Sequence, residues 1–465
     1  MILRPYQTEL LDAARTAYTT YRRVLLQAAT GAGKTAMAST VVAGAIDKHK
    51  RVLYVTHRDE IHGQTDAALE RVGVTARHLK AGGHADAIDP GSVLLASAQT
   101  LARRDVPAHD LLIWDESHVQ HAAQLRVQAA HPQARVLCLT ATPARLDGKP
   151  LADIADVIVS GPSMAWLVEQ GYLTPCRVYA APSPDMHGVP VRGGEFAPGE
   201  AETRHRAPAI VGSIPDQWRK HAAGRRTVLF ASGVDHSREV CAALTMAGVR
   251  AVHVDGTSAP AVRAAAFTGL ASHDLDVVCN VGLAIEGLDL PAIECVYWAR
   301  STASLPVYLQ GTGRGMRLSP GKTDCVVIDG GGNVWRHGLP EEPRVWTLTG
   351  KPKRTAGPGL ATCGECLAIW DGVGPCPRCG STGSPGTERQ PPRGADGELI
   401  IITAADLARN ASRATEPLPP PAWATNAKLW ANLERRRQRD GYDLGDGTRA
   451  HPGYTVAMYR RLNRG

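Results

Sequence analysis

The chain of 465 residues is poor in aromatic residues, which make up 5% of it, and it contains only three Phe. It has no apolar run near the ~20 residues that a membrane-spanning helix needs, so we expect no contact with a membrane. The first six residues, 1–6, lack the charged region and apolar core of a signal peptide. We therefore expect a cytoplasmic protein.

Disulfides are not expected either, although the chain has ten cysteines. Six of them are scattered among apolar residues, where buried free thiols in a reducing cytosol are the simplest interpretation. These six are Cys138, Cys176, Cys241, Cys279, Cys295 and Cys325. The other four cysteines are clustered late in the chain and form a separate motif.

The charge is moderately positive, with a formal net charge of +7. Residues 423–465 carry nine Lys or Arg against four Asp or Glu, a local charge of +5. A basic balance of this size fits a polyanionic partner but is also common in ordinary proteins. The length allows about three domains, and the 43% of hydrophobic residues is enough for sizeable cores.

A glycine-rich segment, 29–35, follows an apolar stretch, 24–27, and precedes an Ala-rich stretch that predicts a helix. A turn between a strand and a helix start can hold phosphates with its backbone N–H groups, while Lys34 reaches the β- and γ-phosphates and Thr35 ligates Mg²⁺. Ala28 stands where the usual pattern has its first Gly. The remaining loop residues expected to contact the nucleotide are Thr30, Gly31, Ala32 and Gly33.

A pair of carboxylates, Asp115 and Glu116, ends a second apolar stretch, 111–114. A carboxylate at a strand end opposite a phosphate loop holds Mg²⁺, and its neighbour polarises the attacking water. Alone, the pair would be interpreted as a solvated turn. Its combination with the phosphate loop favours a site for phosphoryl transfer from ATP.

Further motifs occur in a fixed order along residues 1–340. They are Arg4-Pro5-Tyr6-Gln7, Thr56-His57-Arg58, Ser97-Ala98-Gln99-Thr100, Thr140-Ala141-Thr142-Pro143, Glu286-Gly287-Leu288-Asp289 and Gln310-Gly311-Thr312-Gly313-Arg314-Gly315-Met316-Arg317. Together with Asp115-Glu116-Ser117-His118, a variant of Asp-Glu-Ala-His, they resemble the motifs of a superfamily 2 helicase of the DEAD/DEAH type.

The resemblance implies roles for several residues. Arg4 and Gln7 belong to the adenine-binding motif, although Gln7 could also be a helix-capping residue. Arg314 and Arg317, three apart behind a glycine-rich turn, would meet the γ-phosphate from the second domain and act on rate more than on ATP affinity. The alternative for these two arginines is a basic surface patch. Two more residues complete the implied nucleotide site, namely Gly287 and Asp289.

Other motif residues resemble those that touch or brace the nucleic-acid backbone. They are His57, Arg58, Gln99, Thr100 and the run His253-Val254-Asp255-Gly256. Backbone contacts carry no sequence information, so we expect binding with little sequence specificity. DNA is expected as the partner more than RNA, although no motif in the sequence distinguishes the two. Thr140 and Thr142 resemble the element that couples hydrolysis to strand movement, and His118 either links the two domains or is a structural histidine.

Apolar strands alternate with helical stretches twice along the chain, which predicts two α/β domains with parallel sheets. The first set of expected strands is 24–27, 51–55, 93–96, 111–114, 136–139 and 157–159, and the second is 227–230, 251–254, 277–280, 296–299 and 325–328. The resemblance identifies them as tandem RecA-like domains with ATP in the cleft between them. The expected divisions are an ATP-binding domain, 1–165, a connection, 166–206, a second helicase domain, 207–345, a zinc ribbon, 358–382, and a basic, partly helical C-terminal segment, 398–465.

The clustered cysteines form two C-x-x-C pairs separated by nine residues, Cys363 with Cys366 and Cys376 with Cys379. Four thiolates at this spacing are the ligands of a structural Zn²⁺ site, whose metal would supply the folding free energy of so short a segment. An iron–sulfur cluster is the main rival, and disulfides or a redox pair are the others.

The order of helicase core, four-cysteine segment and basic tail resembles bacterial RadD-like repair helicases and their phage relatives. This resemblance implies a bacterial or phage-infected cell and a role in DNA repair, recombination or replication. The leading hypothesis is therefore an ATP-dependent helicase or translocase, with protein partners through the zinc ribbon or the C-terminal segment. The alternatives are a motor that does not separate strands and a nucleic-acid-binding clamp.

Overall fold

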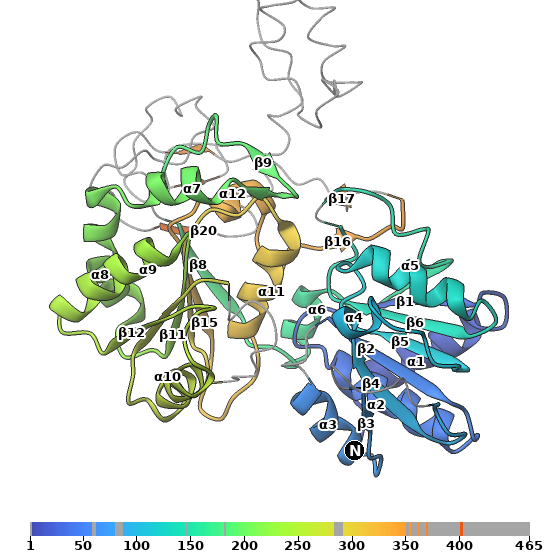
Figure 1. Cartoon of the computed structure of the whole chain (residues 1–465). Helices are drawn as coiled ribbons and strands as arrows, with labels where there is room; N and C mark the ends of the chain where they lie inside the picture. Colours follow the sequence, from blue (N-terminus) through green and yellow to red (C-terminus); the bar gives the residue numbers. More distant parts are fainter. Residues whose placement is uncertain are drawn as a thin grey trace, which may run out of the picture. The chain divides into compact units, whose positions relative to one another are not determined.

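Two seven-stranded sheets organise the computed structural model of this chain (Figure 1). The structure describes residues 2–57, 62–79, 87–145, 147–180, 183–282 and 292–349, together with the backbone of 353–354, 361–362, 369–370 and 400–402. One compact unit comprises residues 1–355 and 388–403 and contains both sheets. A second unit comprises residues 356–387 and 404–465, in which only the paired strands β18 (Ala361–Thr362) and β19 (Ile369–Trp370) are described.

The first sheet and its helices, here called lobe 1, occupy residues 2–160. The strands are β1 (Arg23–Gln27), β2 (Val52–Thr56), β3 (Arg77–His78), β4 (Val93–Ser97), β5 (Leu111–Trp114), β6 (Arg135–Thr140) and β7 (Val157–Ser160). The helices are α1 (Pro5–Ala17), α2 (Lys34–Ile46), α3 (His62–Glu70), α4 (Ala98–Leu101) and α5 (His121–Ala130). All neighbouring strands run parallel in the order β3-β4-β2-β5-β6-β1-β7.

The second sheet and its helices, here called lobe 2, occupy residues 176–337 and 400–402, after the short helix α6 (Met164–Glu169). The strands are β8 (Cys176–Ala180), β11 (Thr227–Ala231), β12 (Ala251–Val254), β13 (Val277–Asn280), β14 (Cys295–Ala299), β15 (Cys325–Asp329) and β20 (Ile400–Ile402). The helices are α7 (Pro198–His205), α8 (Pro208–Ala222), α9 (Val234–Met246), α10 (Pro260–Ser272), α11 (Leu305–Gly315) and α12 (Asn333–His337). The order is β12-β13-β11-β14-β15-β8-β20, parallel except for β20 against β8.

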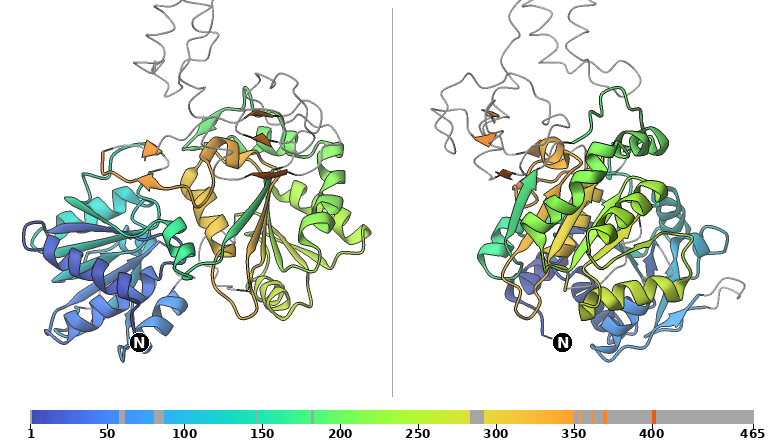
Figure 2. Two further views of the ribbon diagram at one scale, coloured as in Figure 1. Left: turned by 180° about the vertical axis from the view of Figure 1, so that it is seen from behind. Right: turned by 90° about the vertical axis from the view of Figure 1, so that its left-hand side faces the viewer.

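The sheets are buried because their strands are short runs of Val, Leu and Ile whose two faces are both covered. In lobe 2, the right-handed rule for crossovers puts α8 and α9 on one face and α10 and α11 on the other, as Figure 2 shows. Two short antiparallel pairs stand outside the sheets: β9 (Val191–Arg192) with β10 (Glu195–Phe196), and β16 (Arg344–Val345) with β17 (Lys353–Arg354). No helix in the described ranges has the length and apolar character to cross a membrane.

The predicted strands agree with the observed ones to within one residue at each end, but two expectations were wrong. β8 was assigned to the connection 166–206, whereas it pairs with β15 inside the second sheet. Residues 311–315 were expected to form a glycine-rich turn, but they are helical and complete α11. Of the six scattered cysteines, Cys176 and Cys241 are only half-buried, and the other four are buried as expected; all six are free thiols.

Candidate nucleotide site

The loop between β1 and α2 depends on two glycines with left-handed backbone. Gly31 has φ +85° and Gly33, the residue before α2, has φ +83°. A Cβ at Gly33 would lie 2.4 Å from Nε2 of Gln7, and one at Gly31 would lie 2.7 Å from Cδ2 of Leu173. Both positions therefore exclude a side chain, and α2 can begin at Lys34 with its free N–H groups facing the loop.

Ala28, the departure from the usual pattern, is accommodated without strain. It is fully buried, and its N–H donates to the carbonyl of Thr140 on the neighbouring strand (3.1 Å). Its backbone is not left-handed, because it is absent from the non-glycine residues with positive φ in the described ranges. A methyl group therefore fits where other phosphate loops have glycine.

The two carboxylates lie opposite the loop. Nζ of Lys34 is 3.4 Å from Oε1 of Glu116, and the carboxylate of Asp115 accepts the Glu116 N–H (2.9 Å). Burial, with the adjacent Glu116 charge, raises the pKa of Asp115 to about 6. Burial opposes ionisation of Glu116 as well, but the Lys34 ammonium and then His118 outweigh it and lower its pKa. Glu116 is thus kept as a charged base, whereas the Lys34 ammonium only partly offsets the effect of burial and of the Glu116 charge on the pKa of Asp115.

The same residues fit a magnesium ion. Asp115 is 9% exposed, and its pKa is raised first by burial and then by the adjacent Glu116 charge, which a divalent cation would offset. The hydroxyl of Thr35, in the first turn of α2, is the second protein ligand expected. No larger cluster of metal-binding side chains occurs in the described ranges. A pair of ligands suits Mg²⁺, which takes its remaining ligands from phosphates and water.

Side chains of both lobes meet at Glu116. Nε2 of Gln310, on α11, donates to Oε2 of Glu116 (3.3 Å) and lies 3.4 Å from Nε2 of His118. The Nδ1 atom of His118 hydrogen-bonds to the hydroxyl of Thr140 (2.9 Å), which also accepts the N–H of Thr142 (3.1 Å). His118 therefore joins the carboxylate pair to α11 and to the Thr-Ala-Thr-Pro segment.

The two arginines come from the end of α11. Arg314 is only 8% exposed. A Cβ at Gly313 would lie 2.6 Å from Cβ of Thr30, and one at Gly31 would lie 3.6 Å from Cγ of Arg317. The absence of side chains at these two glycines lets the end of α11 approach the phosphate loop closely. Arg317 therefore lies beside the loop, and Arg314 follows directly after the residue that packs against it.

Gln7 contacts the loop and also caps its own helix. Its Nε2 donates to the carbonyl of Ala32 (2.8 Å), and its Oε1 accepts the N–H of Arg4 (2.9 Å). The hydroxyl of Tyr6 donates to the same Ala32 carbonyl (2.9 Å). Helix capping, the alternative interpretation of Gln7, is therefore real, and adenine binding by Gln7 and Arg4 stays a prediction.

Three aromatic rings beside this motif were missed by the sequence analysis. Tyr6, Trp166 and Tyr172 have ring centroids 5.0–6.0 Å apart, and the Arg4 guanidinium lies 4.8 Å from the Tyr172 centroid. Tyr172 lies in the run Gly171-Tyr172-Leu173, and Trp166 lies in α6. A Tyr between Gly and Leu gives no local signal that its ring packs against Tyr6 of α1, more than 160 positions earlier in the sequence.

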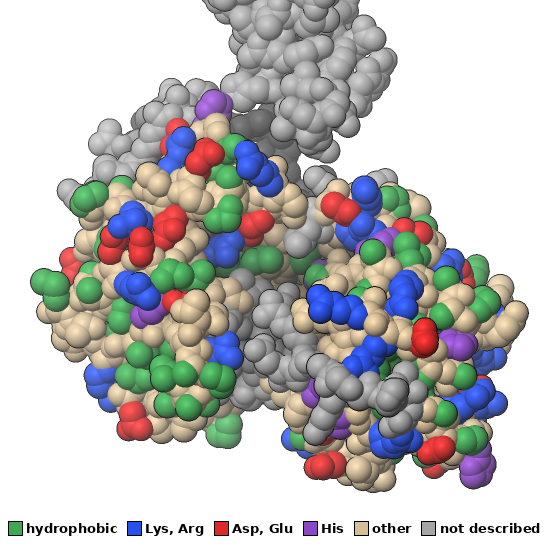
Figure 3. All heavy atoms as spheres, viewed as in Figure 1, with side chains coloured by type: hydrophobic (Ala, Val, Ile, Leu, Met, Phe, Trp, Pro, Cys, Tyr) green, Lys and Arg blue, Asp and Glu red, His purple; other side chains and the backbone are tan. Residues whose placement is uncertain are grey.

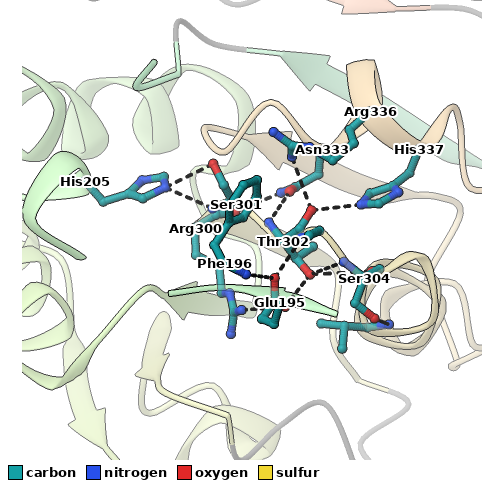
Figure 4. A network of polar contacts seen from close by, with 12 residues as sticks. Glu195, Phe196, His205, Arg300, Ser301, Thr302, Ser304, Asn333, Arg336 and His337 are labelled. Carbon is teal, nitrogen blue, oxygen red and sulfur yellow. Dashed lines mark hydrogen bonds and ion pairs between the residues drawn. The ribbon is translucent and has the colours of Figure 1, made fainter. Parts of the chain in front are cut away.

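The loop 300–304, which joins β14 to α11, is held by the polar network of Figure 4. Glu195 of β10 accepts the hydroxyl of Thr302 (2.5 Å) and the N–H of Ala303 (2.7 Å). It also pairs with the Arg300 guanidinium (2.9 Å). The short strand pair β9–β10 therefore fixes the start of the helix that carries Gln310.

α12 holds the same loop from another direction (Figure 4). The Thr302 N–H donates to the side chain of Asn333 (2.7 Å), and the Thr302 carbonyl accepts from His337 (2.9 Å) and Arg336 (3.2 Å). The hydroxyl of Ser304 then caps the first turn of α11. Because every polar group of Thr302 is bonded, the approach of α11 to lobe 1 is geometrically defined.

The residues predicted to meet nucleic acid are placed at strand ends of both lobes. His57 is buried at the end of β2, and Thr100 donates its N–H to Ser97 in α4 (3.2 Å). In lobe 2, His253 bonds to Asp255 (3.0 Å). Hydrogen bonds, first from Thr257, lower the pKa of Asp255 to about 2. These contacts fix the side chains, and their nucleic-acid role stays a prediction.

Several predicted site residues lie outside the described residues. They are Arg58, Gly287, Asp289 and the four clustered cysteines Cys363, Cys366, Cys376 and Cys379. The basic C-terminal segment also lies there, apart from the backbone of β20. The roles predicted for these residues stay predictions.

Comparison with known proteins follows the same division into lobes. Residues 1–145 match the family model described as type III restriction enzyme, res subunit. Residues 209–319 match the model described as helicase conserved C-terminal domain. The first match contains the phosphate loop and the carboxylates, and the second contains Gln310 and both arginines.

Two relatives are similar along most of this chain. A 51.5 kDa protein of a Lactococcus phage is 28% identical over 353 residues, 74% of this chain and 75% of its own. The putative mitochondrial ATP-dependent helicase irc3 of Schizosaccharomyces pombe is 29% identical over 368 residues. That alignment covers 75% of this chain but only 60% of the yeast protein.

Solved structures of restriction enzymes share the fold. A fragment of a putative HsdR subunit of a type I restriction enzyme from Vibrio vulnificus has a TM-score of 0.59 and 18% identity, covering 76% of this chain and 68% of that one. The ATP-dependent type ISP restriction-modification enzyme LlaBIII bound to DNA has a TM-score of 0.52 and 16% identity, covering 70% and 28%. With both family models, both relatives and the ordered motifs in agreement, the chain belongs to the superfamily 2 helicases, which are ATP-hydrolysing enzymes.

Proposed function

We propose that this chain is an ATP-driven motor that moves along DNA and separates its strands, with a role in repair, recombination or replication. The observation that carries the proposal is the meeting of Lys34, Glu116 and Gln310, side chains contributed by both lobes. Phosphoryl transfer needs little beyond positioning and neutralisation of charge. A site built from two lobes is therefore made or broken by their relative movement.

In the proposed cycle, Lys34 and the loop N–H groups bind the phosphates, and Asp115 with Thr35 holds Mg²⁺. Glu116 orients and deprotonates the attacking water, which its retained negative charge allows. Arg314 and Arg317 stabilise the charge that develops on the γ-phosphate. Gln310 and His118 transmit the presence of phosphate to Thr140 and Thr142.

The choice of DNA is supported by the proteins that this chain resembles. Its first family model is named for a restriction enzyme subunit, and one fold neighbour is bound to DNA. Restriction motors are also the reason to keep translocation without strand separation as the second candidate function. A clamp without hydrolysis is disfavoured because Lys34, Asp115, Glu116, Arg314 and Arg317 are all present.

The test compares ATP hydrolysis with single-stranded DNA, duplex, forked DNA and RNA of equal length. We expect DNA to stimulate turnover more than RNA does, and the forked substrate to be unwound. Stimulation without unwinding would select the second candidate. The Glu116→Gln variant should bind ATP, fail to hydrolyse it and remain on the strand, so rapid release of DNA by this variant would contradict the cycle.

The four clustered cysteines are proposed to bind one Zn²⁺ per chain in a small ribbon that grips duplex DNA or a protein partner. The spacing of the two C-x-x-C pairs supports this proposal. Elemental analysis of the purified chain should find one zinc per chain, and iron or no metal would reject it. The ATPase, assayed with excess Mg²⁺ after the zinc has been removed by a zinc-selective chelator, should survive, since none of the nucleotide-site residues belongs to this segment.

A further inference from the structure

Lobe 1 has a second cavity at the edge of the sheet where the strands begin. Its volume is about 800 Å³, which lies within the range of small-molecule sites. It is bounded by α1, by α2 and by the residues that precede β1, β2, β5 and β6. The phosphate loop follows the end of β1, at the opposite edge, so this cavity is separate from the candidate nucleotide site.

The rim of the cavity is strongly basic. Six Lys or Arg residues line it, Arg15, Arg22, Lys48, Lys50, Arg51 and Arg135, against one acidic residue, Asp110. Asp110 is already paired with Arg51 (3.0 Å), and Arg15 is paired with Asp12 outside the cavity (2.5 Å). Lys48 and Lys50 are exposed and form no ion pair within the described ranges. Figure 3 shows Lys and Arg side chains spread over the visible face of lobe 1, with fewer acidic ones among them.

One polar atom in the cavity wall lacks a partner. His109 is 5% exposed, and its Nδ1 donates to the carbonyl of Pro107 (2.8 Å). Its Nε2 is then an acceptor, and it is buried without a hydrogen bond among the described residues. Burial lowers the pKa of His109 to about 4, so the ring is neutral at physiological pH. An unmet buried acceptor costs about 1–3 kcal/mol. This atom has almost no accessible surface, so the neutral ring contributes packing to the wall and is closed to a ligand in the cavity.

The floor between the cations is apolar and made of small or aliphatic side chains. They are Leu11, Ala14, Val41, Ala45, Leu111 and Leu137. Gly44, in the middle of the α2 wall, leaves further room, because a Cβ there would meet nothing within 4 Å. The cavity thus combines an apolar floor with exposed ammonium groups that form no ion pair among the described residues.

We propose that this cavity binds a nucleotide unit as a second site, with the phosphate at Lys48 and Lys50 and the base on the apolar floor. An apolar ligand would not use the lysines, and a simple anion would not use the apolar floor. A nucleotide can come from two sources, as a free molecule or as one residue of a nucleic-acid strand. Only the second source rests on the proposed function.

The experiment fills the cavity without disturbing the fold. Gly44→Leu places a side chain in open space and improves helix propensity. The matched control is Gly212→Leu in α8 of lobe 2, where a Cβ also meets nothing within 4 Å. Thymidine 5′-monophosphate and an oligo(dT) strand are the probes, each with fluorescence or calorimetric detection on the full chain. Basal ATPase should be unchanged in both variants, because neither glycine lies in the ATP site.

We expect Gly44→Leu to weaken binding of one probe at least tenfold, while Gly212→Leu and Lys34→Ala leave that binding unchanged. Loss of monophosphate binding identifies the free nucleotide as the source. Loss confined to oligo(dT) identifies the strand. If Gly44→Leu alters neither probe, or if only an acidic peptide binds at this cavity, the proposal is wrong.

A second variant tests the chemistry of the rim. Replacement of both Lys48 and Lys50 by Gln removes two charges from exposed positions that have no ion pair in the described part of the chain. The wild type should prefer thymidine 5′-monophosphate over thymidine, and this preference should fall at least fivefold in the double variant. An unchanged preference would overturn the assignment of phosphate to these lysines, and binding of neither compound by the wild type would overturn the free-nucleotide source.

Discussion

The two lobes have the same strand order but carry different segments after the strand at the sixth position of the sheet. In each sheet the first strand in sequence, β1 or β8, is the sixth in space, and the strands that follow it take the same places. In lobe 1 the sixth position leads into the phosphate loop and α2. In lobe 2 it leads through residues 183–190 to the β9–β10 pair and α7. The frame is therefore shared, and the loops after one strand decide which lobe can hold phosphates.

The segment that follows β8 in lobe 2 does not form a phosphate loop and instead holds another loop of the same lobe. There Glu195 reaches the loop 300–304 and fixes the start of α11, as Figure 4 shows. In the proposed cycle, lobe 1 supplies groups that bind the nucleotide, whereas lobe 2 supplies groups whose position matters when the phosphate is transferred. Changes in lobe 1 should then affect ATP binding, and changes in lobe 2 should affect turnover.

The largest effect is expected for Lys34→Ala. Lys34 contacts Glu116 (3.4 Å) and belongs to no core, so its loss should abolish ATP turnover while the fold remains intact. Steady-state ATPase assays and circular dichroism measure the two properties. Lys149→Ala, an exposed lysine of the same lobe, is the control and should be silent. Turnover near the wild-type rate in Lys34→Ala would contradict the assignment of the phosphate loop.

A smaller effect is expected for Glu195→Gln in lobe 2. The amide keeps an acceptor for Thr302 but loses the pairing with Arg300 and offers one oxygen where the carboxylate used two. Because misplacement of a catalytic group by about 1 Å can reduce the rate about 100-fold, kcat should fall by about 10-fold to 100-fold with little change in KM for ATP.

The control for Glu195→Gln is Glu200→Gln, at an exposed position on α7 of the same lobe. It should leave both kcat and KM unchanged. Glu195→Asp should recover part of the rate, since it restores the charge. If kcat fell only together with the free energy of unfolding in Glu195→Gln, and Glu195→Asp recovered neither, Glu195 would be a purely structural residue.

The smallest effect is a pH dependence of stability in lobe 2. His236 is fully buried, and desolvation lowers its pKa to about 4 from the usual 6.5. Between these values the unfolded chain binds more protons than the folded one, so stability is complete above about pH 6.5 and falls toward pH 4. The contribution is up to about 3 kcal/mol, from 1.36 kcal/mol per pKa unit.

Denaturant unfolding at pH 7 and pH 4.5 measures this dependence. His236→Asn keeps an acceptor for the Ser232 N–H but removes the titration, so the difference between the two pH values should shrink. His187→Asn, at an exposed position, should leave it as in the wild type. If the free energy of unfolding of His236→Asn differed between pH 7 and pH 4.5 as much as in the wild type, other groups would cause the loss of stability in acid.

Local patterns were sufficient to predict lobe 1 and most strands of lobe 2. The phosphate loop and the carboxylates follow apolar strands, so their positions at one sheet edge could be inferred from sequence. β8 could not be assigned to lobe 2, because its partner β15 lies far along the chain and pairing is not local. The glycines of 311–315 suggested a turn, whereas they lie inside a helix where Gly311 and Gly315 pack closely against the sheet of lobe 2 and Gly313 packs against Thr30 of lobe 1.

The network around Glu195 was missed although part of it had a signal. Gly193 and Gly194, both with positive φ, lie between β9 and β10, and two glycines between short apolar stretches favour a tight hairpin. That signal predicts the turn but not its target. The contact of Glu195 with loop 300–304 depends on how the segment packs on lobe 2, which no periodicity in the sequence records.

We propose that lobe 1 binds ATP and that lobe 2 completes its hydrolysis. The most direct measurement compares ATP affinity with turnover in Arg314→Ala, whose side chain comes from α11 close to the phosphate loop. The affinity for ATP, measured with a non-hydrolysable analogue, should stay within about threefold of the wild type, while kcat should fall about 10³-fold, as for other arginine fingers. Loss of ATP affinity in parallel with turnover, or turnover at the wild-type rate, would contradict this division of labour between the lobes.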